Sequence, residues 1–332
     1  MIEFDFVGLR TFLAVCEKRS MTEAARHLGT TQSAVSQRLK KLEQKSKFRL
    51  IDRQLRPIGP TPAGQALLQR ARRILSEIDK LEFELSRRTE LPIPELRLGI
   101  ADSLGSALAP ALVSTIRKSV SQLAIRVDAS IDLCRLFLDR DLHAIFSSDP
   151  LQDRDDLERH EIYREPMILA LPIEELVEGE ADLPRLERLV RTLPFIRYSP
   201  VSPLARQIEV HLRRLGVVPA RDLEFNESET ILEMVRHGLG WTITTPLCLL
   251  QSRVSFDDVA VCRLSSSGIS RSFSFICRRN ELGSLSRHLF QTSSAVIQER
   301  VVRRIAEELP WLLGSVSVVP VASESALAAM EA

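Results

Sequence analysis

A run of polar side chains near the N-terminus has the residue types that hydrogen-bond DNA. Amide and hydroxyl side chains can reach base edges, and lysine and arginine bind phosphates. On the opposite face, Val35, Leu39 and Leu42 recur at spacings of four and three, which predicts a helix with one apolar side. Such a helix fits the major groove of double-stranded DNA. The predicted DNA contacts in this segment are Thr31, Gln32, Ser33, Ser36, Gln37, Arg38 and Lys40.

Two further helices are expected to hold this recognition helix in place. Residues 9–16 carry an apolar stripe at helical spacing. A second helix is capped by Ser20 or Thr22 and ends at Gly29, because glycine enters the left-handed conformation without steric cost. Thr30 or Thr31 caps the third helix, which is predicted to run to residue 43 or 44. A plain three-helix domain with a solvated polar face is the alternative.

A β-wing is expected directly after these helices. The segment FRLIDRQLRPIGPTPAG contains two short extended runs around a basic turn that holds proline. Arg53 and Arg56 in this turn are predicted to bind phosphate or to enter the minor groove.

The N-terminal segment resembles the LysR-type transcriptional regulators. The resemblance is carried by FLAVCEKRSMTEAARHLGTTQSAVSQRLKKLEQ, followed by LIDR and TPAG. It implies that Gln32, Ser33 and Ser36 read bases, whereas Gln37 stands where many members have a basic residue. The sequence departs from the family pattern at three positions: Ser46 and Lys47 replace the usual Leu-Gly, and Pro60 replaces the usual leucine. These departures suggest an altered entry into the wing.

One long helix is predicted to follow the wing, from Pro62 to about Arg88, with proline in its first turn. Its apolar residues repeat at alternating spacings of four and three, as in a coiled-coil seam. The family resemblance favours pairing between two copies of the chain, and packing against its own domain is the alternative. The predicted seam consists of Leu67, Ala71, Ile74, Ile78, Leu81 and Leu85.

The rest of the chain alternates between short apolar strands and helices, which predicts α/β structure with parallel strands. The phrases LPFIRYSPVSPLARQIEVHLRRLG and ESETILEMVRHGLGWTITTP resemble the LysR-type effector domain, which is similar to periplasmic binding proteins. The expected fold is therefore an all-α winged helix-turn-helix followed by a two-lobed α/β effector domain. Within that domain, RSFSFICRR is expected to be a strand that returns to the first lobe, and a long helix is expected from about Ser284 to Glu308. The expected segments are 1–61 (winged helix-turn-helix), 62–88 (linker helix), 89–94 (hinge), 95–313 (effector domain) and 314–332 (a weakly ordered tail).

Polar residues at the ends of several strands predict an effector pocket. Ligands in such folds bind beyond the carboxyl ends of the strands, where helix N-termini favour anions. Arg197 is a candidate partner for a carboxylate effector, although Asp102 is an equally good partner for it within the chain. Serine after a strand is also a common helix cap, so each residue has a purely structural alternative. The predicted effector-binding residues are Asp102, Ser103, Ser106, Ser147, Ser148, Arg197, Ser199, Ser202 and Thr244.

The charge distribution separates the N-terminal quarter from the remainder. Residues 1–90 contain 18 Lys and Arg against 11 Asp and Glu, whereas the remainder contains 27 against 33. A basic segment of net charge +7 attached to a remainder of −6 indicates nucleic-acid binding at one end only. The five cysteines form no C-x-x-C pair and the six histidines lack ligand spacing, so no cofactor or metal is expected. A thiol switch between Cys262 and Cys277 is the alternative to reduced, structural thiols.

The expected function is transcription regulation under the control of a small-molecule effector, for which an anion is one candidate. The sequence has no P-loop, G-x-S-x-G, H-E-x-x-H or dinucleotide fingerprint, which argues against an enzyme. A solute-binding protein would share the two-lobed fold but has no use for a basic helix-turn-helix. The N-terminus lacks the pattern of a signal peptide and no apolar run could span a membrane, so a cytoplasmic protein is expected. The expected partners are promoter DNA with dyad symmetry, a second copy of the chain, a tetramer built from such dimers, and RNA polymerase.

Overall fold

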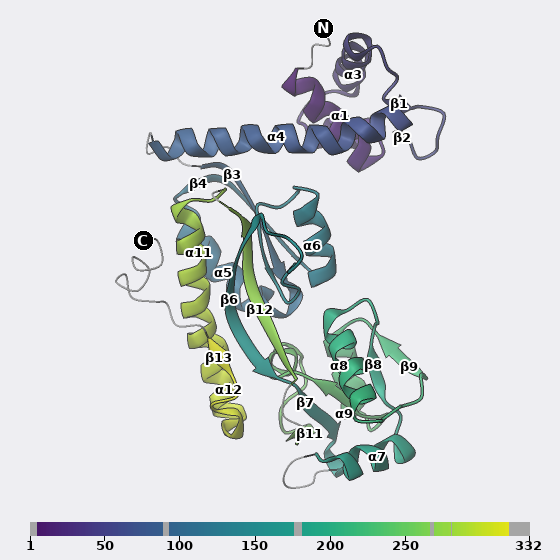
Figure 1. Ribbon diagram of the computed structural model, residues 1–332, viewed down its shortest axis with the longest axis vertical. Coiled ribbons are helices and arrows are strands. Elements are labelled where there is room, and N and C mark those ends of the chain that lie inside the picture. Colours follow the sequence, from purple (N-terminus) through teal and green to yellow (C-terminus); the bar gives the residue numbers. More distant parts are fainter. Residues whose placement is uncertain (1–4, 89–92, 176–180, 266–268, 280, 319–332) are drawn as a thin grey trace. The chain divides into compact units, whose positions relative to one another are not determined.

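The computed structural model describes residues 5–88, 93–175, 181–265, 269–279 and 281–318. The chain divides into two compact units, Met1–Ile93 and Pro94–Ala332 (Figure 1). In the described parts of the chain, no helix is both long and apolar enough to cross a membrane.

The N-terminal unit is a three-helix domain with a two-stranded wing. Its helices α1 (Phe6–Lys18), α2 (Met21–His27) and α3 (Gln32–Ser46) are followed by the antiparallel strands β1 (Ile51–Asp52) and β2 (Gly59–Pro60). The helix starts are capped as expected, by Ser20 rather than Thr22 and by Thr31 rather than Thr30. The core includes Leu9, Phe12, Val15, Ala24, Ala25, Val35, Leu39, Leu42, Leu50 and Ile51.

The recognition helix α3 extends further than predicted, to Ser46 instead of residue 43 or 44. Lys47 ends it in the left-handed conformation, with φ of 63°, at the position where the family usually has glycine. A side chain in this conformation is sterically unfavourable, so Lys47 in place of the family's usual glycine lowers the stability of the folded protein. The glycine of TPAG has a clear role, because a Cβ on Gly64 would clash with the carbonyl oxygen of Leu50.

The long helix α4 (Pro62–Arg88) is present, but its predicted seam divides between two environments. Ala71 is fully buried in the core of its own domain, where Leu75 also lies and Leu67 and Ile78 pack at the edge. The alternative of packing within the domain therefore holds for these residues. Ile74 and Leu81 remain 44% and 54% exposed. The side chain of Leu85 lies outside the described residues.

The first lobe of the C-terminal unit is built on a six-stranded sheet with the order β13-β6-β12-β5-β3-β4. Only part of it is parallel: β3 (Ile93–Ala101) pairs in parallel with β5 (Ala144–Ser147), whereas β12 (Ser270–Arg278) is antiparallel to both β5 and β6 (Leu157–Pro166). The expectation of parallel strands is thus correct for the β-α-β segment, whereas β12, which returns from the second lobe, is antiparallel to both of its neighbours. Helices α5 (Asp102–Ile116) and α6 (Ser130–Leu138) follow β3 and β4 (Val120–Asp128).

The second lobe contains the antiparallel sheet β10-β7-β11, formed by Thr242–Thr244, Ile168–Pro172 and Val259–Arg263. A parallel pair, β8 (Ile196–Tyr198) and β9 (Leu223–Phe225), lies beside it. The covering helices are α7 (Leu183–Thr192), α8 (Pro203–Arg214), α9 (Ser228–Arg236) and α10 (Pro246–Gln251), and a short 3-10 turn covers Ile173–Glu175. The core of this lobe centres on Trp241 and Phe195, whose rings lie 4.6 Å apart.

The long strands β6 and β12 run side by side and connect the lobes (Figure 1). Strand β6 was not predicted, because its charged and polar residues hide the alternation. The C-terminal helix expected over 284–308 occurs as α11 (Ser284–Val296), a π-helical segment (Ile297–Val302) and α12 (Arg303–Glu308), followed by a 3-10 turn at Pro310–Leu312. In the predicted tail, β13 (Ser317–Val318) pairs with β6, and residues 319–332 lie outside the described residues. Of the predicted hinge, Ile93 and Pro94 belong to β3, and residues 89–92 lie outside the described residues.

Candidate nucleic-acid interface and binding pocket

The polar face of α3 is open to solvent on the side opposite its buried residues. Gln32, Ser33, Gln37 and Lys40 are exposed, and Ser36 and Arg38 are partly buried. Thr31 has a structural role as well, since its hydroxyl accepts a hydrogen bond from the Ala34 N–H at 3.2 Å. The structure therefore brings Ser33, Ser36, Gln37 and Lys40 together on one face of α3, with Thr31 and Gln32 at its N-terminal end and Arg38 to one side of this face.

A single carboxylate joins the recognition helix to the wing. Glu43 Oε1 accepts hydrogen bonds from the backbone N–H groups of Leu50 at 2.9 Å and Ile51 at 3.2 Å. Its Oε2 accepts from Arg53 at 3.1 Å. Arg56 donates to the Arg53 carbonyl at 2.9 Å, so the two predicted wing contacts are held in one turn. The role of Glu43 was not predicted, although an acid near the end of a basic helix was the available signal.

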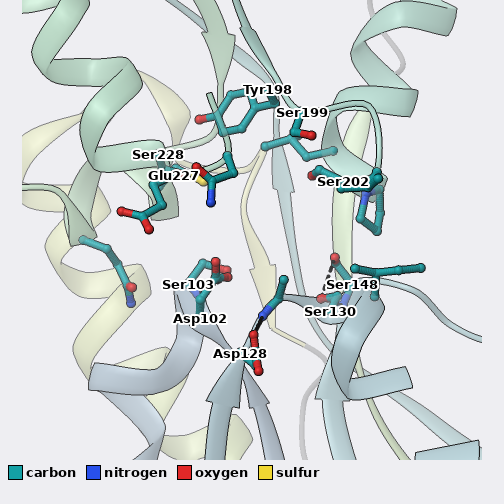
Figure 2. A pocket seen from close by; sticks show the side chains of 18 of the residues that line it. Asp102, Ser103, Asp128, Ser130, Ser148, Tyr198, Ser199, Ser202, Glu227 and Ser228 are labelled. Atoms are coloured by element: carbon teal, nitrogen blue, oxygen red, sulfur yellow. Dashed lines mark hydrogen bonds between the residues drawn. The ribbon is translucent and has the colours of Figure 1, made fainter. Parts of the chain in front are cut away.

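A pocket of about 470 Å³ lies in the C-terminal unit, between the two lobes (Figure 2). Four helices begin at its wall: α5 and α6 from the first lobe and α8 and α9 from the second. The N-cap residues of these four helices form no side-chain hydrogen bond to the first turn, whereas those of α1, α2 and α3 of the N-terminal unit all do. In α5 the Asp102 carboxylate accepts a hydrogen bond from the Ser103 N–H at 2.7 Å. Uncapped helix N-termini attract anionic groups, so this arrangement suits a small polar ligand.

Five of the nine predicted effector-binding residues line this pocket: Asp102, Ser103, Ser148, Ser199 and Ser202. Figure 2 shows them on facing lobes, with Asp102, Ser103 and Ser148 opposite Ser199 and Ser202. The sequence therefore identified the strand ends that meet at the cleft.

Three of the remaining predicted residues do not line the pocket but adjoin residues that do. The hydroxyl of Thr244 is fully buried and lies 2.7 Å from that of Tyr198, which does line the pocket. Ser106 accepts a hydrogen bond from Gln251, another lining residue, at 3.2 Å. Ser147 is turned away, because neighbouring side chains after a strand alternate in direction, and it accepts from the Asp149 N–H at 3.0 Å.

Arg197 requires a correction, because it does not reach the pocket or Asp102. It is 6% exposed, donates to the Pro219 carbonyl at 2.6 Å, and forms an ion pair with Glu209. Arg197 precedes Tyr198 in β8, and successive side chains of a strand point to opposite faces. The pKa of Arg197 is lowered by burial and by the nearby Arg221.

The arginine that lines the pocket is Arg271, which was not predicted. It lies at the start of β12, is 7% exposed, and donates hydrogen bonds to Ser103 Oγ at 3.2 Å and Cys248 Sγ at 3.4 Å. Its guanidinium also lies 4.4 Å from the centre of the Phe273 ring. A basic residue that interrupts the apolar alternation of RSFSFICRR was the available sequence signal.

A buried carboxylate stands behind Arg271. Glu165 is fully buried and accepts hydrogen bonds from the Leu247 N–H at 2.8 Å and the Tyr163 hydroxyl at 3.1 Å. Burial acts to lower the pKa of Arg271, but Cys248 and Glu165 more than offset it and the pKa is raised. Arg271 therefore keeps its positive charge at the pocket wall.

In the described parts of the chain, the cysteines and histidines form no disulfide, reactive-thiol or metal-binding arrangement. All five cysteines are free, and Cys262 and Cys277 lie on strands of separate sheets. Burial raises the pKa of both thiols, which keeps them protonated and unreactive. Burial also lowers the pKa of His143 to about 3, where the ring accepts a hydrogen bond from the Arg97 N–H. No group of three or more metal-ligating side chains occurs among the described residues.

Comparison with protein families and known proteins gives matches along most of the chain. Residues 6–65 match the model of the bacterial regulatory helix-turn-helix protein of the LysR family, and residues 89–297 match that of the LysR substrate binding domain. The HTH-type transcriptional regulator CzcR of Bacillus subtilis is 27% identical over 237 residues, which cover 71% of this chain and 78% of that protein.

Solved structures show the same fold over nearly the whole chain. A full-length OxyR variant from Pseudomonas aeruginosa superimposes with a TM-score of 0.66 at 17% identity, covering 89% of this chain and 95% of that one. Full-length CbnR, solved in complex with its target DNA, superimposes with a TM-score of 0.57 at 20% identity, covering 88% of this chain and all of the other (100%).

Proposed function

The chain belongs to the LysR family of bacterial transcriptional regulators, and we propose that it reads promoter DNA through α3 and the wing. Membership establishes a DNA-binding regulator with an effector-binding domain, and the family consists of regulators rather than enzymes. The predicted fold class is thereby confirmed. The residues that contact DNA, the oligomeric state, the link to RNA polymerase and the class of ligand are proposals.

Base edges are contacted by Gln32, Ser33 and Ser36, whose side chains project from the first turns of α3. Lys40 and Arg38 further along the helix and Arg53 and Arg56 in the wing contact phosphates. The observation that carries this proposal is the Glu43 carboxylate, which bonds the start of the wing and Arg53. A single rigid surface can then place one helix in the major groove and the wing beside it.

The active form is a homodimer joined through α4. Ile74 and Leu81 lie on one helix and leave apolar side chains in water, which a second copy of the helix would bury. Two-fold symmetry of such a dimer matches DNA with dyad symmetry, and two dimers assemble into a tetramer that bends the promoter. The protein acts in the cytoplasm and influences RNA polymerase there.

A small molecule in the pocket controls this assembly. The starts of α6, α8 and α9, whose N-cap residues form no side-chain hydrogen bond, provide donors for an anionic group together with Arg271. The ligand changes the DNA complex only by binding one lobe arrangement more tightly than another. We assign segments 1–61, 62–88 and 95–313 to DNA binding, dimerisation and effector binding, respectively.

Binding of the purified full-length protein to sheared genomic DNA of its own organism, at a stated moderate salt concentration, tests this function. We expect a few enriched sites with dyad symmetry, and their neighbouring genes would nominate effectors. Uniform binding that salt abolishes, with no enriched site, would contradict it.

A further inference from the structure

Two carboxylates on opposite walls of the pocket are placed to face a bound ligand. Asp102 and Glu227 come from the starts of α5 and α9 and face each other across the cleft in Figure 2. Neither forms a salt bridge with a described residue, although Asp102 accepts a hydrogen bond from the Ser103 N–H at 2.7 Å and its charge helps to raise the pKa of Arg271. The other two acids of the lining differ, since Asp128 pairs with Arg126 at 2.8 Å and Glu229 with Arg253 at 3.3 Å.

Groups that favour an anion lie beside Asp102. Arg271 is the only cation that lines the pocket among the described residues, and its Nε–H has no hydrogen-bond partner there. Ser103, which accepts from Arg271, follows Asp102 immediately in the chain. The start of α5 thus places the carboxylate of Asp102, which attracts cations, next to Ser103 and Arg271, which attract anions.

This combination disfavours a ligand that carries negative charge alone. A simple carboxylate at Ser103 and Arg271 would be repelled by Asp102 and Glu227 at short range. An α-amino acid carries its ammonium and carboxylate on a single carbon, so both groups can bind where cation and anion sites adjoin. A pocket of about 470 Å³ falls in the usual size range for small ligands.

We propose that the effector is a zwitterion of the amino-acid class. Its ammonium lies between Asp102 and Glu227, and its carboxylate lies at Ser103 and Arg271. The inference rests on the proposed function of the pocket as the effector site and names its ligand class.

Calorimetry and thermal unfolding of the full-length protein with each of the twenty standard L-amino acids test the proposal. We expect saturable binding and a higher Tm with at least one of them. Its analogue without the amino group should bind about tenfold more weakly or worse, since a charge-assisted contact is lost. Glu227→Gln and Asp102→Asn should each lower the affinity of the protein for the amino acid by a similar factor.

Glu233→Gln is the matched control, because Glu233 lies on the same helix outside the pocket and pairs with Arg236 at 2.7 Å. It should leave ligand affinity unchanged. Binding of carboxylates without an amine in preference to amino acids would overturn the proposal, as would no binding of any amino acid. Equal affinity of the wild type and Glu227→Gln would also overturn it.

The same preparation is assayed for enriched DNA sites in parallel. Specific DNA binding without amino-acid binding would reject the ligand class and leave the regulator assignment intact. Amino-acid binding without any enriched DNA site would reject the function proposed for α3.

Discussion

Arg271 on β12 donates a hydrogen bond of 3.2 Å to the hydroxyl of Ser103 at the start of α5. The bond joins the strand that returns from the second lobe to the first helix of the first lobe. A ligand that binds both residues therefore contacts an element that runs between the lobes, which gives pocket occupancy a direct route to their relative position.

The clamp formed by Glu43 is expected to support both stability and DNA affinity. Glu43→Ala leaves the N–H groups of Leu50 and Ile51 without their acceptor, at a cost of about 1–3 kcal/mol in the free energy of unfolding. Urea unfolding measures this loss. DNA affinity should fall while the preferred base sequence stays the same, because Glu43 touches no base. A changed base preference would show that the carboxylate has a direct role in recognition.

Lys47 offers a way to stabilise the protein. Lys47→Gly removes the side chain from a left-handed residue, and we expect a gain of about 0.5–1 kcal/mol after the extra flexibility of glycine in the unfolded chain is counted. The midpoint of urea unfolding should rise. Arg19→Gly is a parallel test, because Arg19 ends α1 in the same left-handed conformation, with φ of 50°. A lower midpoint in both variants would contradict the assignment of strain to these residues.

The exposed apolar side chains of α4 should control dimerisation. Ile74→Ala and Leu81→Ala together are expected to raise the dimer dissociation constant at least about tenfold, since each buried leucine or isoleucine contributes roughly 1.5–3 kcal/mol. Sedimentation velocity measures the change. Ile173→Ala, which removes an exposed isoleucine far along the sequence, is the control. An unaltered dimer in the double variant would rule out the α4 seam.

Burial of His143 predicts a specific loss of stability in acid. The pKa in the folded state is about 3, whereas a histidine in the unfolded chain titrates near its ordinary value of 6.5. Below pH 6.5 the unfolded state therefore binds a proton that the folded state does not, and stability falls as pH decreases from 6.5 toward 3. The expected slope from this residue is about 1.4 kcal/mol per pH unit. In His143→Gln, urea midpoints between pH 6.5 and pH 4.5 should depend less on pH; an identical dependence would contradict the burial effect.

The sequence predicted the DNA-binding unit more completely than the pocket, for physical reasons. The apolar spacing of Val35, Leu39 and Leu42 determines which face of α3 is buried, so the exposed polar face follows directly. At the pocket, Ser103 and Ser148 were found because strand ends converge at one edge of a sheet. Arg197 was misplaced, because whether a side chain faces the cleft depends on a one-residue alternation within a three-residue strand.

Arg271 illustrates what local sequence cannot supply. It reaches the pocket only because β12 returns from the second lobe and lies antiparallel to β5 and β6. The acceptor Ser103 lies on another element, and no local pattern pairs the two. Long-range strand pairing of this kind was predicted as a return to the first lobe, but without its direction or its register.

The most direct test of the central claim is the affinity of α3 variants for an enriched site and for a scrambled duplex at one salt concentration. We expect Gln32→Ala and Ser36→Ala to lower binding to the enriched site by about 1–3 kcal/mol each, with little effect on the scrambled duplex. Lys40→Ala should weaken both duplexes similarly and reduce the salt dependence by about one phosphate contact. An unchanged ratio of the two affinities in both Gln32→Ala and Ser36→Ala would show that α3 does not read the sequence.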